Sequence, residues 1–349
     1  MRVVHCSGTA YEMGKQIGEA CGDVLSKSID TTLGILSRGH QTTVEDVIRT
    51  ASKFIEPVRQ YDPLIIDQLQ GQADALNIPF EKMFTLRCVF EMSYYYKQIQ
   101  GLCTSIAVTG KATADGKTIL AQNIDWLNSY EPYLLHMHYE DGTRILALSL
   151  SGMVEYSLSS NGFGNCANSL FTKGDHYRFS LPLGCYLPKV MRQSSVNDAM
   201  NLLKEVARGV GYFHLADNRG TMFGIESTFE DVEVISPIND VLSHSNCYCT
   251  ERFQQEDLAP IILPDALLRR ERVSALIKEA FGNITIDTVK GILADHGNPP
   301  YSICRHSDIE KPAAWEMTTV ASFIMLPEDG VMYITKGSPC ENTYVKYIV

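Results

Sequence analysis

The sequence has no long apolar run. No window approaches the roughly 18 consecutive apolar residues that a membrane-spanning helix needs. Its first residues, MRVVHCSGTAYEMG, lack the apolar stretch of a secretion signal, so we expect a cytoplasmic protein. It also has no run of Lys or Arg, and 41 acidic against 30 basic residues give a net charge of −11. This balance argues against nucleic acid or an anionic membrane as the main partner.

The ten cysteines include no Cys-x-x-Cys pair, so neither a zinc ribbon nor a thioredoxin-like motif is indicated. Without a secretion signal, we expect reduced cysteines that are mostly small core residues. His136 and His138 are two apart, but no acidic or thiol partner stands at a suggestive spacing. The sequence therefore predicts no metal site and no cofactor.

The 349 residues are 45% hydrophobic, which is enough for a large core. The whole sequence before about residue 100 has the pattern of helices. Asp62 followed by Pro63 is a favourable helix start, a cap and then a first-turn proline. The segments with helical periodicity or helix-start signals are 13–25, 44–58, 63–76 and 79–96.

After residue 100 the apolar period becomes two, which is typical of strands. Strand-like runs alternate with turns such as ADGK at 114–117, and helical stretches return at about 195–208 and 264–295. Antiparallel hairpins interspersed with helices predict an α+β protein in which helices cover stacked sheets.

Cys103 stands at this junction, at the start of the first clear strand. A hairpin at 114–117 would bring residues near 123–127 opposite Cys103. Asn123 and Asp125 are two apart and so share one face of their strand. The pattern predicts a thiol, an amide and a carboxylate at one end of a sheet. The alternative is that Asn123 and Asp125 only cap the strand end.

Six motifs in order resemble the acyl-coenzyme A:isopenicillin N acyltransferase family of autoproteolytic N-terminal-nucleophile enzymes: CSGTAYEMGKQIG, CTS, AQNIDW, GIES, LSHSNCY and YSICRH. The CTSI run is also similar to the acid ceramidase and N-acylethanolamine amidase branch. The resemblance implies one four-layer αββα domain over residues 1–349. It also implies self-cleavage between Leu102 and Cys103 into a helical segment, 1–102, and a catalytic segment, 103–349, that stay associated as a heterodimer.

The same resemblance implies roles for individual residues. Cys103 would be the nucleophile, Asp125 the aspartate beside it, and Asn246 the donor to the oxyanion. The implied substrate-binding positions are Thr104, Ser105, Asn123 and Arg305. The sequence departs from the acyltransferases at Leu102, where they have Gly, and at Thr104-Ser105, where they have Thr-Thr.

The implied activity is that of a cysteine amidohydrolase or acyltransferase. A Cys103 thioester would carry an acyl group from a small N-acyl or acyl-coenzyme A donor to water or to an amine, such as an amino acid or a penicillin-like acceptor. The freed α-amine of Cys103 would serve as the base. One alternative is a non-catalytic relative that binds a small ligand. Another is a papain-like pair of Cys103 with His244, against which the strand-like CTSIAVTG argues.

Overall fold

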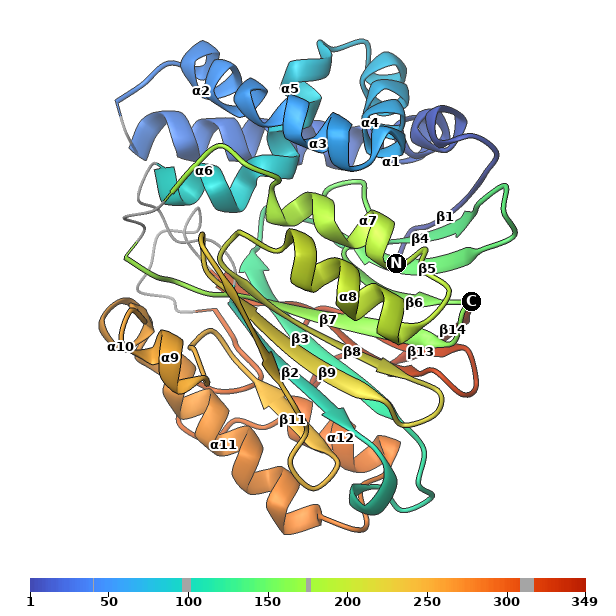
Figure 1. The fold of residues 1–349 in the computed structure, drawn as a ribbon, viewed down its shortest axis with the longest axis vertical. Coiled ribbons are helices and arrows are strands. Elements are labelled where there is room, and N and C mark those ends of the chain that lie inside the picture. The colour runs from blue at the N-terminus through green and yellow to red at the C-terminus, as the bar shows by residue number, and fades with distance from the viewer. Residues whose placement is uncertain (40, 96–101, 174–176, 308–316) are drawn as a thin grey trace.

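The computed structural model describes residues 1–39, 41–95, 102–173, 177–307 and 317–349. Within them, two β-sheets stack face to face and helices cover both outer sides (Figure 1). The eight-stranded sheet contains, in spatial order, β1 (Val3–Ser7), β4 (Tyr133–His138), β5 (Arg144–Ser149), β6 (Tyr156–Ser159), β7 (Phe163–Ser169), β8 (Gly211–Asp217), β9 (Met222–Ser227) and β10 (Val232–Ile235). The six-stranded sheet contains β11 (Val241–His244), β2 (Leu102–Val108), β3 (Ile119–Leu127), β12 (Met317–Leu326), β13 (Val331–Lys336) and β14 (Val345–Ile348).

The helices divide between the two outer faces. The eight-stranded sheet is covered by α1 (Ala10–Gly39), α2 (Val44–Ala51), α3 (Ile55–Tyr61), α4 (Pro63–Leu76), α5 (Phe80–Phe84), α6 (Val89–Tyr95), α7 (Tyr186–Val190) and α8 (Val196–Val206). The six-stranded sheet is covered by α11 (Asp265–Ala280) and α12 (Ile286–Leu293), which follow the short helices α9 (Glu251–Gln254) and α10 (Ala259–Ile262). Short 3₁₀ turns are η1 (Ser52–Phe54), η2 (Thr85–Cys88), η3 (Gly110–Ala112) and η4 (Leu183–Cys185).

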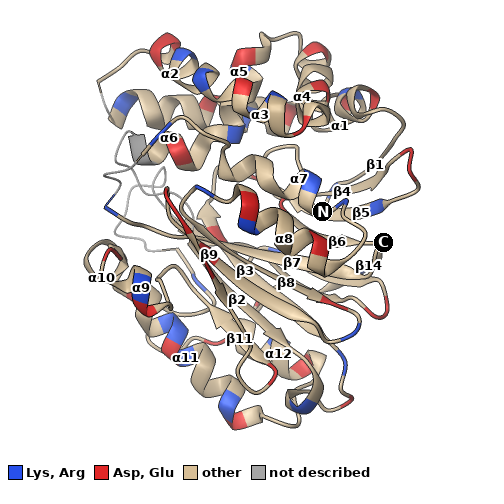
Figure 2. Cartoon of the chain, in the orientation of Figure 1, with Lys and Arg blue, Asp and Glu red and all other residues tan. Residues whose placement is uncertain are grey.

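Three apolar clusters fill the spaces between the layers. Representative members are Ile17 and Met137 between the N-terminal helices and the first sheet, Ile124 and Leu158 between the sheets, and Ile106 and Val273 between the second sheet and α11. Charged side chains of both signs lie mainly on helices and loops, whereas the central strands are largely uncharged (Figure 2). The predicted α+β class and αββα layering are confirmed.

Most of the predicted helical region is helical, with local corrections. Asp62 caps α4 by accepting from the backbone nitrogen of Leu64 (3.3 Å), as its sequence predicts. The stretch 44–58 is broken by η1, and the stretch 79–96 is broken by η2 as far as it is described. None of the helices in the described parts of the chain is both long and apolar enough to cross a membrane.

The prediction that everything before residue 100 is helical is wrong for β1. This strand pairs in parallel with β4, with Val3 opposite Leu134. Its side chains alternate between buried and more exposed positions at the edge of the sheet. Five residues are too few for that alternation to stand out in the sequence against the helix that follows.

The predicted hairpin around residues 114–117 is present and places the candidate nucleophile. β2 and β3 are antiparallel, with Leu102 opposite Asp125 and Cys103 opposite Ile124. Every residue of β2 is buried because layers cover both of its faces. β11 lies on the other side of β2 and delivers the segment that contains Asn246.

Candidate active site

The thiol of Cys103 faces the space between the two sheets. Cys103 is 2% exposed, and Ala107, four residues along the same strand, belongs to the inter-sheet cluster. Cys103 lines a mainly apolar cavity between β2, α6 and the first sheet. The apolar residues around it include Leu86, Val89, Phe90, Trp126, Tyr130, Leu150, Val154, Tyr156, Leu187 and Phe213. A thiol at the wall of such a cavity can meet an apolar acyl group.

Burial raises the pKa of Cys103 to about 12, and the negative charge of Asp125 acts in the same direction. The thiol therefore stays protonated near neutral pH in the uncut chain. Because a thiolate is the reactive form, a nearby base is needed to take the proton.

Two long-range partners hold the backbone of Cys103. Its N–H donates to Oδ1 of Asn246 (2.8 Å), and its carbonyl accepts from Nη1 of Arg269 (2.7 Å). Nη2 of Arg269 also donates to Oδ1 of Asn246 (3.0 Å), and its Nε to Oδ2 of Asp265 (3.1 Å). The fully buried Arg269 thus ties β2, α11 and the segment after β11 together. The sequence analysis missed it, although the Asp265–Arg269 spacing of four on a helix was visible.

Asn246 is at the site, but its orientation differs from the prediction. Its Nδ2 donates to the carbonyl (2.9 Å) and to Oγ (3.2 Å) of Ser169. Its Oδ1 faces Cys103 N–H and the Arg269 guanidinium, both of which can only donate. In this arrangement, Asn246 is an acceptor for the Cys103 nitrogen and not a donor aimed at an oxyanion.

Asn168 has the unused amide donor that Asn246 lacks. It lies in β7 and lines the same cavity as Cys103. Its Oδ1 accepts from Oγ of Ser105 (2.7 Å), whereas its Nδ2 is buried without a hydrogen-bond partner among the described residues. An asparagine inside a buried strand is a poor strand former, and this signal could have identified Asn168 from sequence.

Asp125 and Asn123 do share a face, as predicted, but it is the face opposite the Cys103 thiol. The register pairs Cys103 with Ile124, so the two polar side chains point away from the inter-sheet space, toward the layer that contains α11 and α12. Asn123 donates to the carbonyls of Leu293 (2.8 Å) and Ile303 (2.9 Å), which makes it a structural link. The thiol therefore lies on one face of this end of the sheet, and the amide and the carboxylate lie on the other.

Asp125 remains next to the Cys103 backbone through its pairing with Leu102. Its Oδ1 accepts from Oγ1 of Thr319 (2.7 Å), and Oδ2 lies 3.7 Å from Nε of Arg305. Burial raises the pKa of Asp125, although Arg305 and Arg269 oppose this effect.

The other predicted substrate-binding residues do not line the cavity. Arg305 contacts Asp265 and Asp125, and Oγ1 of Thr104 accepts from Arg269 (2.8 Å). Ser105 supports Asn168, as described above. Among the predicted site residues, Cys103 alone belongs to the described lining of the cavity.

His244 does not pair with Cys103. Its Nε2 lies 2.9 Å from Oε1 of the buried Glu226, and its ring stacks on Tyr212 with 3.6 Å between centroids. Burial alone would lower the pKa of His244, but Cys249 and Glu226 raise it to about 9. A papain-like pair with Cys103 is therefore not formed.

Residues 190–341 match the family model described as acyl-coenzyme A:6-aminopenicillanic acid acyl-transferase. The family resemblance is confirmed. The match includes Asn246, Arg269 and Arg305 but not Cys103, and it supports an enzyme of the acyltransferase type.

Several solved structures are similar to part of this chain. The Caenorhabditis elegans N-acylethanolamine-hydrolyzing acid amidase ortholog is 15% identical, with a TM-score of 0.47, over 65% of this chain and 93% of that one. A mutant of conjugated bile acid hydrolase from Clostridium perfringens is 14% identical, with a TM-score of 0.42, over 71% and 97%. Penicillin V acylase from Agrobacterium tumefaciens is 12% identical, with a TM-score of 0.45, over 67% and 83%.

Proposed function

We propose that the chain is a self-processing cysteine amidohydrolase or acyltransferase whose nucleophile is Cys103. The proposal is based mainly on one observation, that the side chain and the backbone of Cys103 lie in two different environments. Its thiol lines an apolar cavity, while its backbone nitrogen and carbonyl are held by Asn246 and Arg269. In this position, the Cys103 sulfur can reach an acyl group bound in the cavity. Its own backbone nitrogen is held in place close to that sulfur.

Processing would begin with attack of the Cys103 sulfur on the carbonyl carbon of Leu102. The C–N bond breaks, the nitrogen gains a proton, and the new thioester between Leu102 and Cys103 is hydrolysed by water. The products would be residues 1–102 and a catalytic segment, 103–349, that starts with a free α-amine.

That α-amine has a reference pKa of about 7.7–8.0, so it can accept the thiol proton near neutral pH. Oδ1 of Asn246, which accepts from this nitrogen in the uncut chain, would continue to orient it. Asp125 would add negative charge on the other side of the strand. The Nδ2 of Asn168 would donate to the oxyanion that forms when the substrate carbonyl is attacked.

The apolar cavity supports a small substrate with an apolar acyl group, either an N-acyl amide or an acyl-coenzyme A. The acyl group would form a thioester with Cys103 and then pass to water or to an amine such as an amino acid or a penicillin-like acceptor. The Trp126, Phe90 and Phe213 rings favour acyl groups that bury apolar area.

Intact mass and N-terminal sequencing of fresh protein test the proposal. We expect a fragment that begins at Cys103. We also expect the protein to convert members of a panel of N-acyl amino acids and acyl-coenzyme A donors, with the products detected by mass spectrometry. Cys103→Ala should stay full-length, folded and inactive, with Cys166→Ala, a change at another buried cysteine, as the control that keeps processing. A second fragment that begins elsewhere, or turnover by Cys103→Ala, would refute the proposed nucleophile.

A further inference from the structure

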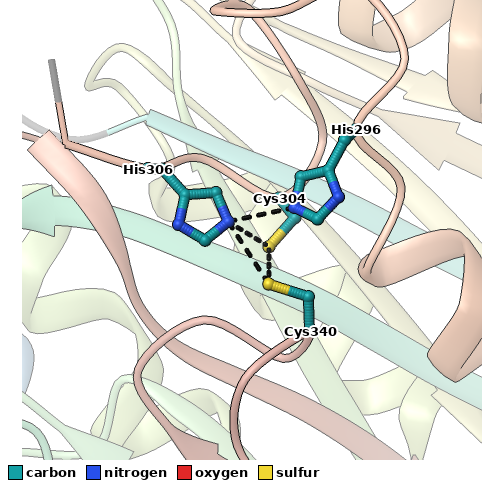
Figure 3. Close-up of side chains that lie close together, drawn as sticks. All are labelled: His296, Cys304, His306 and Cys340. Carbon is teal, nitrogen blue, oxygen red and sulfur yellow. Dashed lines mark hydrogen bonds between the residues drawn. The ribbon is translucent and has the colours of Figure 1, made fainter.

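Four potential metal ligands gather at one surface of the molecule, on the α12 side of the six-stranded sheet. His296, Cys304 and His306 lie in the segment after α12, and Cys340 lies in the turn after β13 (Figure 3). Their ligand atoms all lie within 4.8 Å of one another. The side chains converge although Cys340 is 34 residues from His306 in the sequence.

Four of the six distances between these atoms are known individually and lie within about 0.3 Å of the edges of a tetrahedron around one zinc ion. The two sulfurs are 3.6 Å apart, and the Nε2 atoms of the two histidines are 3.0 Å apart. Nε2 of His306 lies 3.2 Å from Sγ of Cys340 and 3.7 Å from Sγ of Cys304. Zinc bonds of about 2.3 Å to sulfur and about 2.0–2.1 Å to nitrogen give tetrahedral edges of roughly 3.3–3.8 Å.

We propose that these four residues form a Cys₂His₂ site for a zinc ion. Two thiolates and two imidazoles are a typical ligand set for tetrahedral Zn²⁺. Since the protein fills all four positions, no position stays open for substrate, so the ion would be structural and would take no part in the thioester chemistry. The proposal departs from the expectation of no metal, which considered only Cys-x-x-Cys pairs and His136 with His138.

The surroundings already orient two of the ligands. Oε1 of Glu341 lies 3.7 Å from Nδ1 of His306, the ring nitrogen that does not face the cluster. The Cys304 backbone nitrogen donates to the carbonyl of Asp295 (3.0 Å), and the Asp295 carboxylate is paired with Arg272. The segment is therefore anchored on the side away from the cluster.

The position of the cluster gives the ion a function in the fold. Arg305 lies between two of the ligands, Cys304 and His306, and contacts Asp125 and Asp265. A zinc ion would join this segment to the turn that carries Cys340 and hold Arg305 against Asp125. Loss of the ion should therefore lower the thermal stability of the protein while the position of the Cys103 thiol stays unchanged.

Native mass spectrometry and elemental analysis of the full-length protein, purified with a reducing agent, test the site. We expect one zinc per chain, and one Co²⁺ after exchange, with the intense absorption of tetrahedral thiolate-bound cobalt. Cys340→Ser and His306→Asn should each weaken zinc binding about 100-fold or more while the circular dichroism spectrum is retained. His138→Asn, at an exposed histidine on β4, should leave binding unchanged.

Cys249→Ser is the second control, because Glu226, His244 and Cys249 are another group of potential ligands. If Cys249→Ser removes the zinc and Cys340→Ser does not, the assignment to the surface cluster is wrong. The proposal is also overturned if the reduced wild-type protein binds no zinc at tenfold excess. A Cys304–Cys340 disulfide in freshly purified protein, detected as a loss of two hydrogens, would contradict it as well.

Discussion

At the scale of single residues, the two sides of Cys103 have different tasks. The thiol is directed into the cavity, whereas the peptide nitrogen is held by Asn246, which is 143 residues away in the sequence. This arrangement separates acceptor and donor functions between two asparagines. Asn246 accepts from the Cys103 nitrogen, and Nδ2 of Asn168 has no hydrogen-bond partner in the part of the chain that the structure describes.

We therefore predict that Asn168→Leu lowers the rate of turnover by about 10²–10³ with little effect on folding, because it removes an oxyanion donor. Steady-state kinetics on the processed protein measure this effect. Asn161→Leu, at an exposed asparagine of the β6–β7 turn, is the matched control and should retain the wild-type rate. A rate within a few-fold of wild type for Asn168→Leu would exclude it as the donor.

A second residue-scale prediction concerns Cys249. Burial opposes its ionisation, but the charge and hydrogen bond of His244 outweigh burial and lower the pKa of Cys249. Its thiolate should thus form at lower pH than that of an ordinary cysteine, and alkylation by iodoacetamide should follow. Peptide mapping across a pH series measures the midpoint.

In His244→Gln the charge is lost and burial remains, so the midpoint for Cys249 should move above the ordinary thiol range of about 8.5. The matched control is His138→Asn, which should leave the midpoint unchanged. A wild-type midpoint at or above the ordinary value would contradict the pairing with His244.

At the scale of elements, the close approach of α1 and α4 depends on glycine. A Cβ on Gly71 would lie 2.1 Å from the carbonyl oxygen of Tyr11, and one on Gly14 would lie 1.9 Å from that of Gln68. Both contacts are with backbone, which cannot move aside as a flexible side chain can. The two helices therefore pack with their backbones nearly in contact.

Gly71→Ala should consequently destabilise the fold by about 1–3 kcal/mol, the usual cost of overpacking, despite the better helix propensity of alanine. Gly291→Ala in α12 is the control, because a Cβ there meets nothing within 4 Å. It should stabilise the protein by up to about 1 kcal/mol. Urea unfolding of both variants measures the difference, and equal effects would contradict the close packing.

The helices and strands also show which features of the fold could be predicted from the sequence. Period and turn signals predicted the β2–β3 hairpin, the α4 cap and an α+β fold in which helices cover stacked sheets, because these depend on local spacing. The four-layer αββα arrangement was implied by the family resemblance. That Asn123 and Asp125 share a face was predicted, but which face carries the Cys103 thiol depends on a one-residue register that no local signal determines. Arg269 and the cluster with Cys340 were missed because loops of unknown path bring them into place.

At the scale of the whole molecule, segment 1–102 contributes a strand and most of one helical layer to a common core. β1 pairs with β4, and α1 packs against the outer face of the same sheet. Cutting between Leu102 and Cys103 would leave all of these contacts in place.

We predict that the two cleaved segments co-elute in gel filtration under native conditions and separate only in denaturant. Separation would expose the apolar face of the eight-stranded sheet to water. The uncut Cys103→Ala protein is the reference for elution volume. Independent elution of the two segments without denaturant would contradict a shared core.

The long-range hold on Cys103 also has a consequence for the order of events during synthesis. When the Leu102–Cys103 bond is made, another 143 residues must be added before Asn246 is in the chain, and another 166 before Arg269 is. Until those residues arrive, the Cys103 peptide lacks the partners that fix it. The proposed cut would therefore be postponed until the chain has been translated and packed at least as far as Arg269, and a product that ends before this residue would remain an inert precursor.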